Sequence, residues 1–220
     1  GMASVNDSFP LYAEAVNEKG LAMAALNFPG NAYYQKPDGE GLEIASFEVI
    51  AWILGKCASV AEAEKFLDEM KIVDLAFSDQ MSPAPLHWMI ADREKCLVLE
   101  AVRDGLKVYE NPFGVLTNNP PFEYHRMNMN NYMNLTAESP QNRFADRLDL
   151  KPYAQGMGAM GLPGDASSAS RFVRAAFLKW NSVAPEEEKA NVSQFFHILD
   201  SVAMVRGSVV TDQGTYDITT

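Results

Sequence analysis

Apolar and polar positions follow two periods along the chain, one typical of strands and one typical of helices. Two apolar runs, at residues 10–16 and 21–28, flank the tetrapeptide Asn17-Glu18-Lys19-Gly20. This arrangement predicts a β-hairpin, with glycine at the position that needs a positive φ. The second run is rich in Ala and Met and alternates poorly, which is typical of a strand buried on both faces.

Four further apolar runs predict strands at residues 71–77, 85–92, 96–102 and 106–112, with the turn sequences "DREK" and "RDG" between them. Connections this short join antiparallel neighbours. We therefore expect these four strands to form an antiparallel meander.

Two helices are predicted ahead of the meander, at residues 46–57 and 59–71, with Ser46 and Ser59 as N-caps. Apolar residues recur at helical spacing along the first of them. Its buried face is expected to consist of Phe47, Ile50, Ala51 and Leu54.

The last third of the chain is predicted to be helical. A polar helix at residues 122–135 and an irregular stretch at 138–155 precede a helix capped by Ser167 or Ser168. A further helix is expected at residues 185–202, with Pro185 in its first turn. The apolar face of the capped helix comprises Phe172, Val173, Ala176, Phe177 and Trp180. The final segment, 207–220, has the pattern of a hairpin.

Helical and strand segments therefore fall into separate blocks and do not alternate as β-α-β units. This segregation predicts an α+β fold with antiparallel sheets, not a doubly wound parallel sheet. No repeat or low-complexity tract divides the 220 residues, so a single domain spanning 1–220 is expected.

The composition of the chain argues against several classes of protein, namely disordered, nucleic-acid-binding and membrane proteins. Hydrophobic residues make up 47% of the chain, enough for a sizeable core, and the net charge of −11 argues against a nucleic-acid partner. Cys57 and Cys96 lie in apolar surroundings without a C-x-x-C partner, which favours free thiols in a reducing compartment. No signal peptide and no membrane-spanning run is recognisable, so a soluble, cytoplasmic protein is predicted.

Residues 156–161 spell G-x-G-x-x-G, the fingerprint of a dinucleotide-binding turn. That turn must follow a buried parallel strand and open a helix at its last glycine. Here Pro152 interrupts the preceding segment, and Gly161 is followed by Leu-Pro-Gly-Asp, which forbids a helix at that point. A nucleotide site is therefore not predicted.

Three polar residues carry candidate chemistry. Arg171 falls in a first helical turn, where a cation opposes the macrodipole; it is either solvated or held there by an anion or thiolate. Asn27 follows an expected buried strand and Asn118 ends another, positions where asparagine serves turn chemistry or donates to a developing oxyanion. The histidines His87, His125 and His197 lack metal-ligand spacing and are expected to be structural.

Three segments, "NEKGLAMAALNFPGNA", "LTNNPPFEYH" and "GLPGDASSASRFVRAAF", occur in this order and separation. Together they closely resemble the choloylglycine hydrolase family, which comprises bile salt hydrolases and penicillin V acylases. The resemblance spans nearly the whole chain. "LNFPG" is more similar to the bile salt hydrolase branch, because the penicillin V acylase branch tends to carry tyrosine where Asn27 stands.

The resemblance implies a four-layer αββα fold of the N-terminal-nucleophile type, here without the family's first and last strands. It implies an amidase that cleaves glycine- or taurine-conjugated bile salts with an N-terminal cysteine, through a thioester and without a metal or organic cofactor. By motif match Asn27 and Asn118 would be the oxyanion-side and substrate-positioning amides. Arg171 would lie beside the nucleophile and stabilise its thiolate.

One departure from the family pattern stands out: the nucleophile, with the arginine and aspartate that follow it, belongs upstream of this sequence. Residue 1 is Gly, and Cys57 and Cys96 match neither the position nor the context of the nucleophile. The 220 residues by themselves are therefore predicted to lack amidase activity.

The family resemblance also suggests contacts and partners. Phe77 and Met81 lie where the family has a mobile loop over the substrate, and they are candidate substrate-binding residues that core or surface packing explains equally well. Residues 134–155 resemble a loop that embraces a neighbouring subunit, which implies a homotetramer. Penicillin V acylase or acyl-homoserine-lactone acylase activity and a catalytically silent binding or assembly module are the alternatives.

Overall fold

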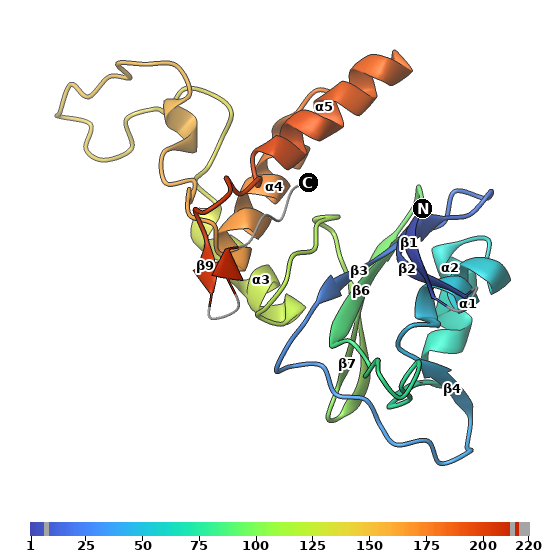
Figure 1. Cartoon of the computed structure of the whole chain (residues 1–220). Helices are drawn as coiled ribbons and strands as arrows, with labels where there is room; N and C mark the ends of the chain where they lie inside the picture. The colour runs from blue at the N-terminus through green and yellow to red at the C-terminus, as the bar shows by residue number, and fades with distance from the viewer. Residues whose placement is uncertain (7–8, 212–213, 216–220) are drawn as a thin grey trace. The chain divides into compact units, whose positions relative to one another are not determined.

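The computed structural model describes residues 1–6, 9–211 and 214–215 (Figure 1). Its contacts divide the chain into two compact units, unit 1 (Gly1–Phe122) and unit 2 (Glu123–Thr220). Along the sequence, the two α-helices that lie wholly in unit 1 fall between two of its strands, whereas unit 2 is mainly helical. The prediction of one domain over residues 1–220 stays a prediction.

Unit 1 is built on a six-stranded sheet in which every neighbouring pair is antiparallel. Its strand order is β1-β2-β3-β6-β7-β8. The strands are β1 (Met2–Asn6), β2 (Phe9–Val16), β3 (Ala22–Asn27), β6 (Leu86–Ala91), β7 (Cys96–Val102) and β8 (Gly105–Glu110). The predicted meander is thus confirmed for β6, β7 and β8.

The hairpin between β2 and β3 is also confirmed. Gly20 has a φ of 85°, which a residue with a side chain rarely adopts. The Asn17 side-chain oxygen accepts hydrogen bonds from the backbone N–H groups of Lys19 and Leu21. The turn is therefore fixed by asparagine and glycine together.

The expected strand at residues 71–77 does not belong to the meander. It is realised as β5 (Met70–Val73), which pairs in parallel with β4 (Leu42–Ala45), a strand that the pattern did not predict. A parallel pair needs a crossover connection. Here α1 (Val49–Lys56) and α2 (Val60–Leu67) provide it.

The two helices of unit 1 differ from the predictions at their ends. Ser59 caps α2 by accepting from the N–H of Glu62, as predicted. Ser46 does not cap α1, because the helix begins three residues later, with Glu48 at the N-cap position. α2 ends at Leu67, short of the predicted end at residue 71, because the chain enters β5 at Met70.

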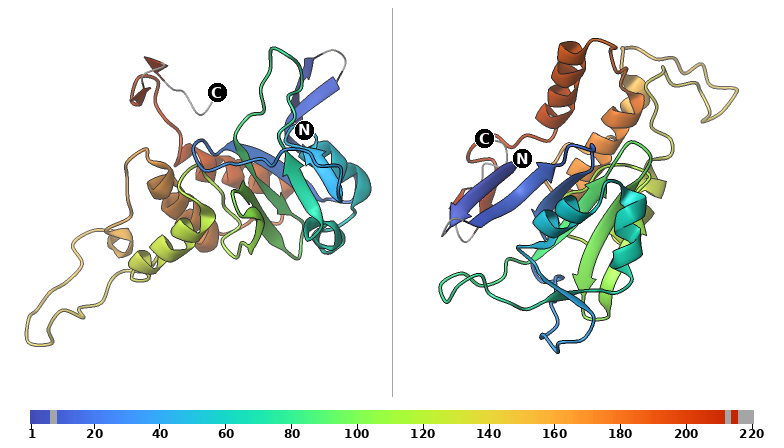
Figure 2. Two further views of the ribbon diagram at one scale, coloured as in Figure 1. Left: turned by 90° about the horizontal axis from the view of Figure 1, so that it is seen from below. Right: turned by 90° about the vertical axis from the view of Figure 1, so that its right-hand side faces the viewer.

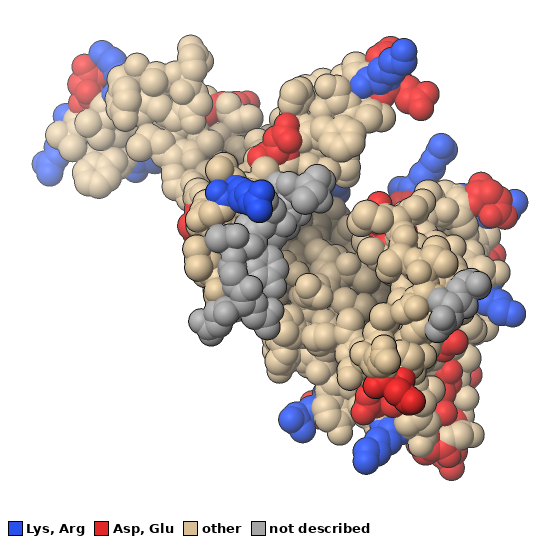
Figure 3. All heavy atoms as spheres, in the orientation of Figure 1, with Lys and Arg blue, Asp and Glu red and all other residues tan. Residues whose placement is uncertain are grey.

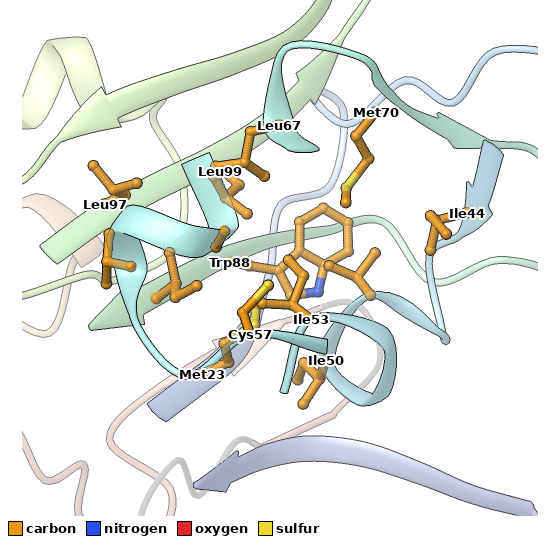
Figure 4. Packing of buried hydrophobic residues seen from close by; sticks show 14 of the residues in the cluster. Met23, Ile44, Ile50, Ile53, Cys57, Leu67, Met70, Trp88, Leu97 and Leu99 are labelled. Carbon is orange, nitrogen blue, oxygen red and sulfur yellow. The ribbon is translucent and has the colours of Figure 1, made fainter. Parts of the chain in front are cut away.

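The core of unit 1 lies between these helices and one face of the sheet (Figure 4). On α1 the buried residues are Val49, Ile50 and Ile53, whereas Phe47, Ala51 and Leu54 of the predicted face are only half-buried. In β3 only Met23 is fully buried, so the expected burial on both faces is wrong. Burial of a large apolar side chain contributes about 1.5–3 kcal/mol. The sheet and helices contribute to this cluster Met23, Ile50, Ile53, Cys57, Leu67, Trp88, Ile90, Leu97 and Leu99, among others.

Unit 2 contains two long helices, α4 (Ser168–Asn181) and α5 (Glu188–Asp200), after α3 (Phe122–Asn128), which begins at the last residue of unit 1. Two 3-10 helices, Met129–Tyr132 and Met157–Ala159, flank an extended irregular loop that projects from the helices (Figure 2). The predicted hairpin near the C-terminus is present as β9 (Val210–Thr211) and β10 (Gly214–Thr215); the last residues of that prediction, 216–220, lie outside the described residues.

Two details of the helix predictions in unit 2 are wrong. Ser167 caps α4 as expected, and Phe172, Val173 and Ala176 are buried, but Trp180 is 65% exposed near the end of the helix. Pro185 lies before α5, whose N-cap is Glu187. The Glu187 carboxylate accepts from the N–H groups of Lys189 and Ala190 and so replaces the missing intrahelical partners.

The G-x-G-x-x-G segment has no nucleotide-binding geometry. No described strand leads directly into it, since β8 ends at Glu110, and α4 begins seven residues after Gly161. At Gly158 a side chain would collide with the backbone carbonyls of Thr136 and Glu138. The N–H of Thr136 also donates to the Gly158 carbonyl across 3.0 Å. Glycine is therefore required here for close approach of two backbone segments.

None of the described helices is long and apolar enough to cross a membrane. On the face shown in Figure 3, Lys and Arg side chains are scattered singly and do not form one basic patch. The α+β class predicted from the segregated blocks is confirmed by a mainly antiparallel sheet and five α-helices in the described residues.

Candidate functional site

Asn27 and Asn118 lie next to each other in unit 1. Asn27 is the last residue of β3, and its backbone carbonyl accepts a hydrogen bond of 3.0 Å from the side-chain amide of Asn118. Asn118 does not end a strand, as the pattern suggested, but lies in the irregular segment 112–121. The Asn27 side chain is exposed and forms no hydrogen bond within the described residues, so its N–H groups face solvent.

Further amide hydrogen bonds join the same two segments. The Asn119 side chain donates to the Pro29 carbonyl across 2.7 Å, and the Asn31 side chain donates to the Asn119 side-chain oxygen across 3.0 Å. The N–H of Phe28 donates to the Pro85 carbonyl, which ties the end of β3 to the start of β6. Residues 27–31 and 117–119 are therefore held as one structure, which we name the asparagine clamp.

The buried side chain of His87 contacts both segments of the asparagine clamp. His87 on β6 is 0% exposed, and its ring stacks on Phe28 with the centroids 4.3 Å apart. Its Nε2 lies 2.8 Å from the Thr117 carbonyl oxygen, and its Nδ1 lies 3.1 Å from Oε1 of the buried Glu100. His87 was expected to be a structural histidine; its contact with the clamp could not be predicted, because its partners Phe28, Glu100 and Thr117 come from three separate segments.

Arg171 lies in unit 2, on the first turn of α4, where the sequence placed it. The residue is only 7% exposed, and its Nε donates to the Ala166 carbonyl across 3.1 Å. Burial lowers the pKa of the Arg171 guanidinium, and the neighbouring charge of Arg174 adds to this shift. The alternative of a solvated arginine is therefore wrong.

Two residues that the sequence did not single out shape the loop before α4. The Asp165 carboxylate accepts from the Ser167 N–H and from the Ser170 hydroxyl. The pKa of Asp165 is held well below its usual range by these interactions. The hydroxyl of Ser167 has the largest effect, followed by the hydroxyl of Ser170 and the Ser167 N–H. Arg174 donates to the carbonyls of Pro163 and Asp165 and, through Nε, to Ser201. An aspartate two residues before a serine N-cap was the available signal for this loop.

Phe77 and Met81 lie in the loop between β5 and β6. The Phe77 ring packs against Phe9 and Phe47, with centroids 5.7 and 5.2 Å apart, and it is half-buried. Met81 is 38% exposed, and its backbone carbonyl accepts from the Phe77 N–H. Phe77 thus takes part in an aromatic cluster, whereas the Met81 side chain faces solvent.

Neither cysteine is placed as an activated nucleophile. Neither forms a disulfide within the described residues: Cys57 is buried in the core of unit 1, and Cys96 is half-buried at the start of β7. Burial raises the pKa of the Cys57 thiol, and the charge of Glu62 adds to this. A thiol with a raised pKa is a poor nucleophile, since the thiolate is the reactive form.

The groups brought together in unit 1 are suited to an oxyanion. Primary amide N–H groups stabilise negative charge on oxygen without a proton transfer, and a buried guanidinium such as that of Arg171 does the same for oxygen or sulfur anions. The Asn118 amide in unit 1 and the Arg171 guanidinium in unit 2 each donate to a backbone carbonyl, whereas the Asn27 amide is exposed. Each unit therefore contains donors of a type that can stabilise an anion.

Comparison with known proteins identifies the class. The model of the linear amide C–N hydrolases, choloylglycine hydrolase family, matches residues 1–220. The chain is 49% identical over 219 residues to the bile salt hydrolase/transferase of Lactiplantibacillus plantarum, covering all of this chain and 68% of that protein. The chain is thus a hydrolase of the class that acts on linear amide bonds. Within this class it belongs to the choloylglycine hydrolase family.

Solved structures agree. A variant of the conjugated bile acid hydrolase from Clostridium perfringens superimposes with a TM-score of 0.87 at 39% identity, over 99% of this chain and 67% of that one. Penicillin V acylase from Agrobacterium tumefaciens has a TM-score of 0.72 at 20% identity, over 93% of this chain and 57% of that one, and so shares the fold. The predicted fold of N-terminal-nucleophile type is confirmed by these likenesses.

Proposed function

We propose that the protein carrying this chain hydrolyses the amide bond of glycine- or taurine-conjugated bile salts. The observation that carries the proposal is the asparagine clamp: Asn118 donates to Asn27 at 3.0 Å, and both residues lie in the segments that resemble the family. The bile salt hydrolase/transferase of Lactiplantibacillus plantarum, at 49% identity, supports the same substrate class.

The proposed chemistry divides the hydrolysis into two acyl transfers. A cysteine thiolate attacks the amide carbonyl carbon, and the C–N bond breaks as glycine or taurine leaves with a proton on its nitrogen. Water then attacks the thioester carbonyl, and the thiol is released with the free bile acid. The amides of Asn27 and Asn118 donate to the carbonyl oxygen or position the substrate, and Arg171 stabilises the thiolate.

The thiol is proposed to come from outside the 220 residues. Cys57 is buried with a raised pKa, and Cys96 lies on a sheet strand. Both positions are unlike that of a terminal nucleophile whose own amino group acts as base. The 220 residues alone are therefore proposed to lack turnover, while keeping the donors that surround the reaction.

Several further properties belong to the same proposal. Met81, with its exposed side chain, and Phe77 contact the bile acid or acyl group. The protein works in the cytoplasm as a homotetramer with subunits joined through residues 134–155, and the reaction needs no metal or organic cofactor. The exposed apolar side chains of Phe144 and Tyr153, each 83% exposed, support a subunit contact through that loop.

The test compares two forms of the protein on three substrates. The 220-residue chain and the protein translated with its upstream coding region are each incubated with glycocholate, taurocholate and penicillin V, and free amine is detected with ninhydrin. We expect turnover of the bile salts by the longer protein only. Penicillin V turnover in preference to bile salts would favour the acylase alternative, which Asn27 argues against.

Variants of the longer protein test whether Arg171 and Asn27 take part in the reaction. Arg171→Lys and Asn27→Ala are expected to lower kcat, and Asn130→Ala, on an exposed asparagine, serves as the matched control. Absence of turnover by the longer protein on every substrate would contradict the proposal and would favour a catalytically silent binding or assembly module.

A further inference from the structure

His87 and Glu100 form a buried polar pair beside the asparagine clamp. The Thr117 carbonyl can only accept, so His87 Nε2, 2.8 Å away, donates to it. Glu100 Oε1 lies 3.1 Å from His87 Nδ1 and also accepts from the Phe122 N–H across 2.9 Å. The ring of His87 is therefore held at both of its nitrogens.

The pair is enclosed within unit 1. His87 is 0% and Glu100 1% exposed, and one ring face of His87 is covered by Phe28. In the β6–β7 ladder Trp88 is opposite Leu99, which places His87 and Glu100 side by side on the other face of the sheet. A buried polar pair of this kind is a weak source of stability, and its presence is better explained by the geometry that it fixes.

His87 contacts both halves of the asparagine clamp. Its ring stacks on Phe28, the residue after Asn27, and its Nε2–H binds the carbonyl of Thr117, the residue before Asn118. Neither asparagine side chain is itself bonded to His87. The histidine thus fixes the two backbone segments from which the asparagine side chains extend.

We infer that His87, oriented by Glu100, is a positioning residue that sets Asn118 against Asn27. This inference rests on the proposed function for its catalytic meaning, since it concerns the amides assigned there. The geometry that it predicts belongs to the 220-residue chain and is measurable without turnover. Failure of the hydrolysis assay and failure of this inference are therefore separate results.

The first measurement is the ring nitrogen spectrum of His87 in the isotopically labelled 220-residue chain. Long-range proton–nitrogen correlation distinguishes protonated from unprotonated ring nitrogens, and His197→Gln aids the assignment. We expect Nε2 of His87 to carry a proton, as its bond to the Thr117 carbonyl requires. An unprotonated Nε2 would overturn the inference.

The second measurement is hydrogen exchange of asparagine side-chain amides in His87→Phe, His87→Gln and the parent chain. Phenylalanine keeps an aromatic ring but removes both ring nitrogens, and glutamine restores one donor for the Thr117 carbonyl. We expect exchange of the Asn118 and Asn119 amides to accelerate about tenfold in His87→Phe, the effect of one lost hydrogen bond, with partial recovery in His87→Gln.

An internal control separates positioning from loss of stability. The Asn17 side chain donates to the carbonyls of Leu54 and Cys57 in the same unit, away from the clamp, and its exchange is expected to stay unchanged. Equal acceleration of Asn17 and Asn118, or none at Asn118, would contradict the inference. If His87→Phe does not fold, Glu100→Gln against the exposed Glu110→Gln makes the same comparison, with the same expected contrast.

Discussion

The side-chain amide of Asn118 donates to the backbone carbonyl of Asn27 across 3.0 Å, and so joins two segments 91 residues apart. The bond uses one asparagine to fix the backbone beside the other. Asn27 thereby keeps its own side chain exposed at the end of β3. The position of the Asn118 amide therefore depends on the backbone at Asn27.

Removal of the Asn118 side chain should affect both turnover and local structure. Asn118→Ala in the protein with its upstream coding region is expected to lower kcat for glycocholate by about 10²-fold, the usual effect when a group that positions the substrate is lost. The free energy of unfolding should fall by only about 1 kcal/mol, the net value of one hydrogen bond. Steady-state kinetics and urea unfolding check the two values, and unchanged kcat would remove Asn118 from the catalytic machinery.

Acid should loosen the N-terminus of α4. The pKa of Asp165 is held below its usual range by hydrogen bonds from Ser167 and Ser170. A depressed folded-state pKa gives stability that is present above the unfolded value of about 3.9 and is lost as pH falls through the lower folded value. Amide exchange at Ser170 and Arg171, followed from pH 6 to pH 2 (roughly the span of carboxyl titration), should accelerate in the parent chain.

Asp165→Asn is the matched variant for this acid effect. The asparagine retains an acceptor for the Ser167 N–H and cannot titrate, so the pH dependence of exchange at Ser170 should be reduced. A variant that retains the full pH dependence would assign the acid sensitivity to another group.

Cys57 should resist alkylation. Its thiol is buried and its pKa is raised, so the thiolate needed for reaction is scarce and shielded. In the folded chain, iodoacetamide is expected to modify Cys57 more slowly than the half-buried Cys96, and in urea the two rates should converge. Mass spectrometry of the peptides measures both, and rapid labelling of Cys57 in the folded chain would argue against the packing described for the core of unit 1.

Gly158→Ala should loosen the irregular loop of unit 2. The added methyl group would collide with the carbonyls of Thr136 and Glu138, so the two backbone segments must separate. Tryptic cleavage after Arg143 and Arg147 is expected to accelerate severalfold, as backbone segments become more accessible. Gly164→Ala is the control, because a methyl group there meets open space. Equal cleavage rates in the two variants would show that the approach at Gly158 does not restrain the loop.

The sequence predicted well those elements whose signals are local. The hairpin at Asn17–Gly20 and the serine caps at Ser59 and Ser167 depend on residues within a few positions of each other, and all three were confirmed. β4 was missed because four residues of a parallel pair carry no alternation. Ser46 was a wrong cap because Glu48, whose carboxylate accepts from the Ala45 N–H, forms the turn before α1 instead.

Some residues of the candidate site could be predicted from the sequence, and others could not. Asn27, Asn118 and Arg171 were singled out by their types and by a resemblance, and the structure brings Asn27 and Asn118 together; their catalytic roles stay predictions. The pairing of His87 with Glu100 was out of reach, because it needs the β6–β7 register and the path of residues 112–121 at once. Long-range polar partners of this kind leave no periodic signal in the sequence.

The register of β6 has a consequence for how this protein tolerates change in length. Adjacent strand residues point to opposite faces, so His87 faces the asparagine clamp while Trp88 enters the helix-covered core. Inserting one residue after His87 within the strand would reverse this parity and send the imidazole ring toward the apolar side. The loop from Asp74 to Pro85 can lengthen without that effect. The number of residues in β6 therefore decides whether His87 can reach the asparagine clamp at all.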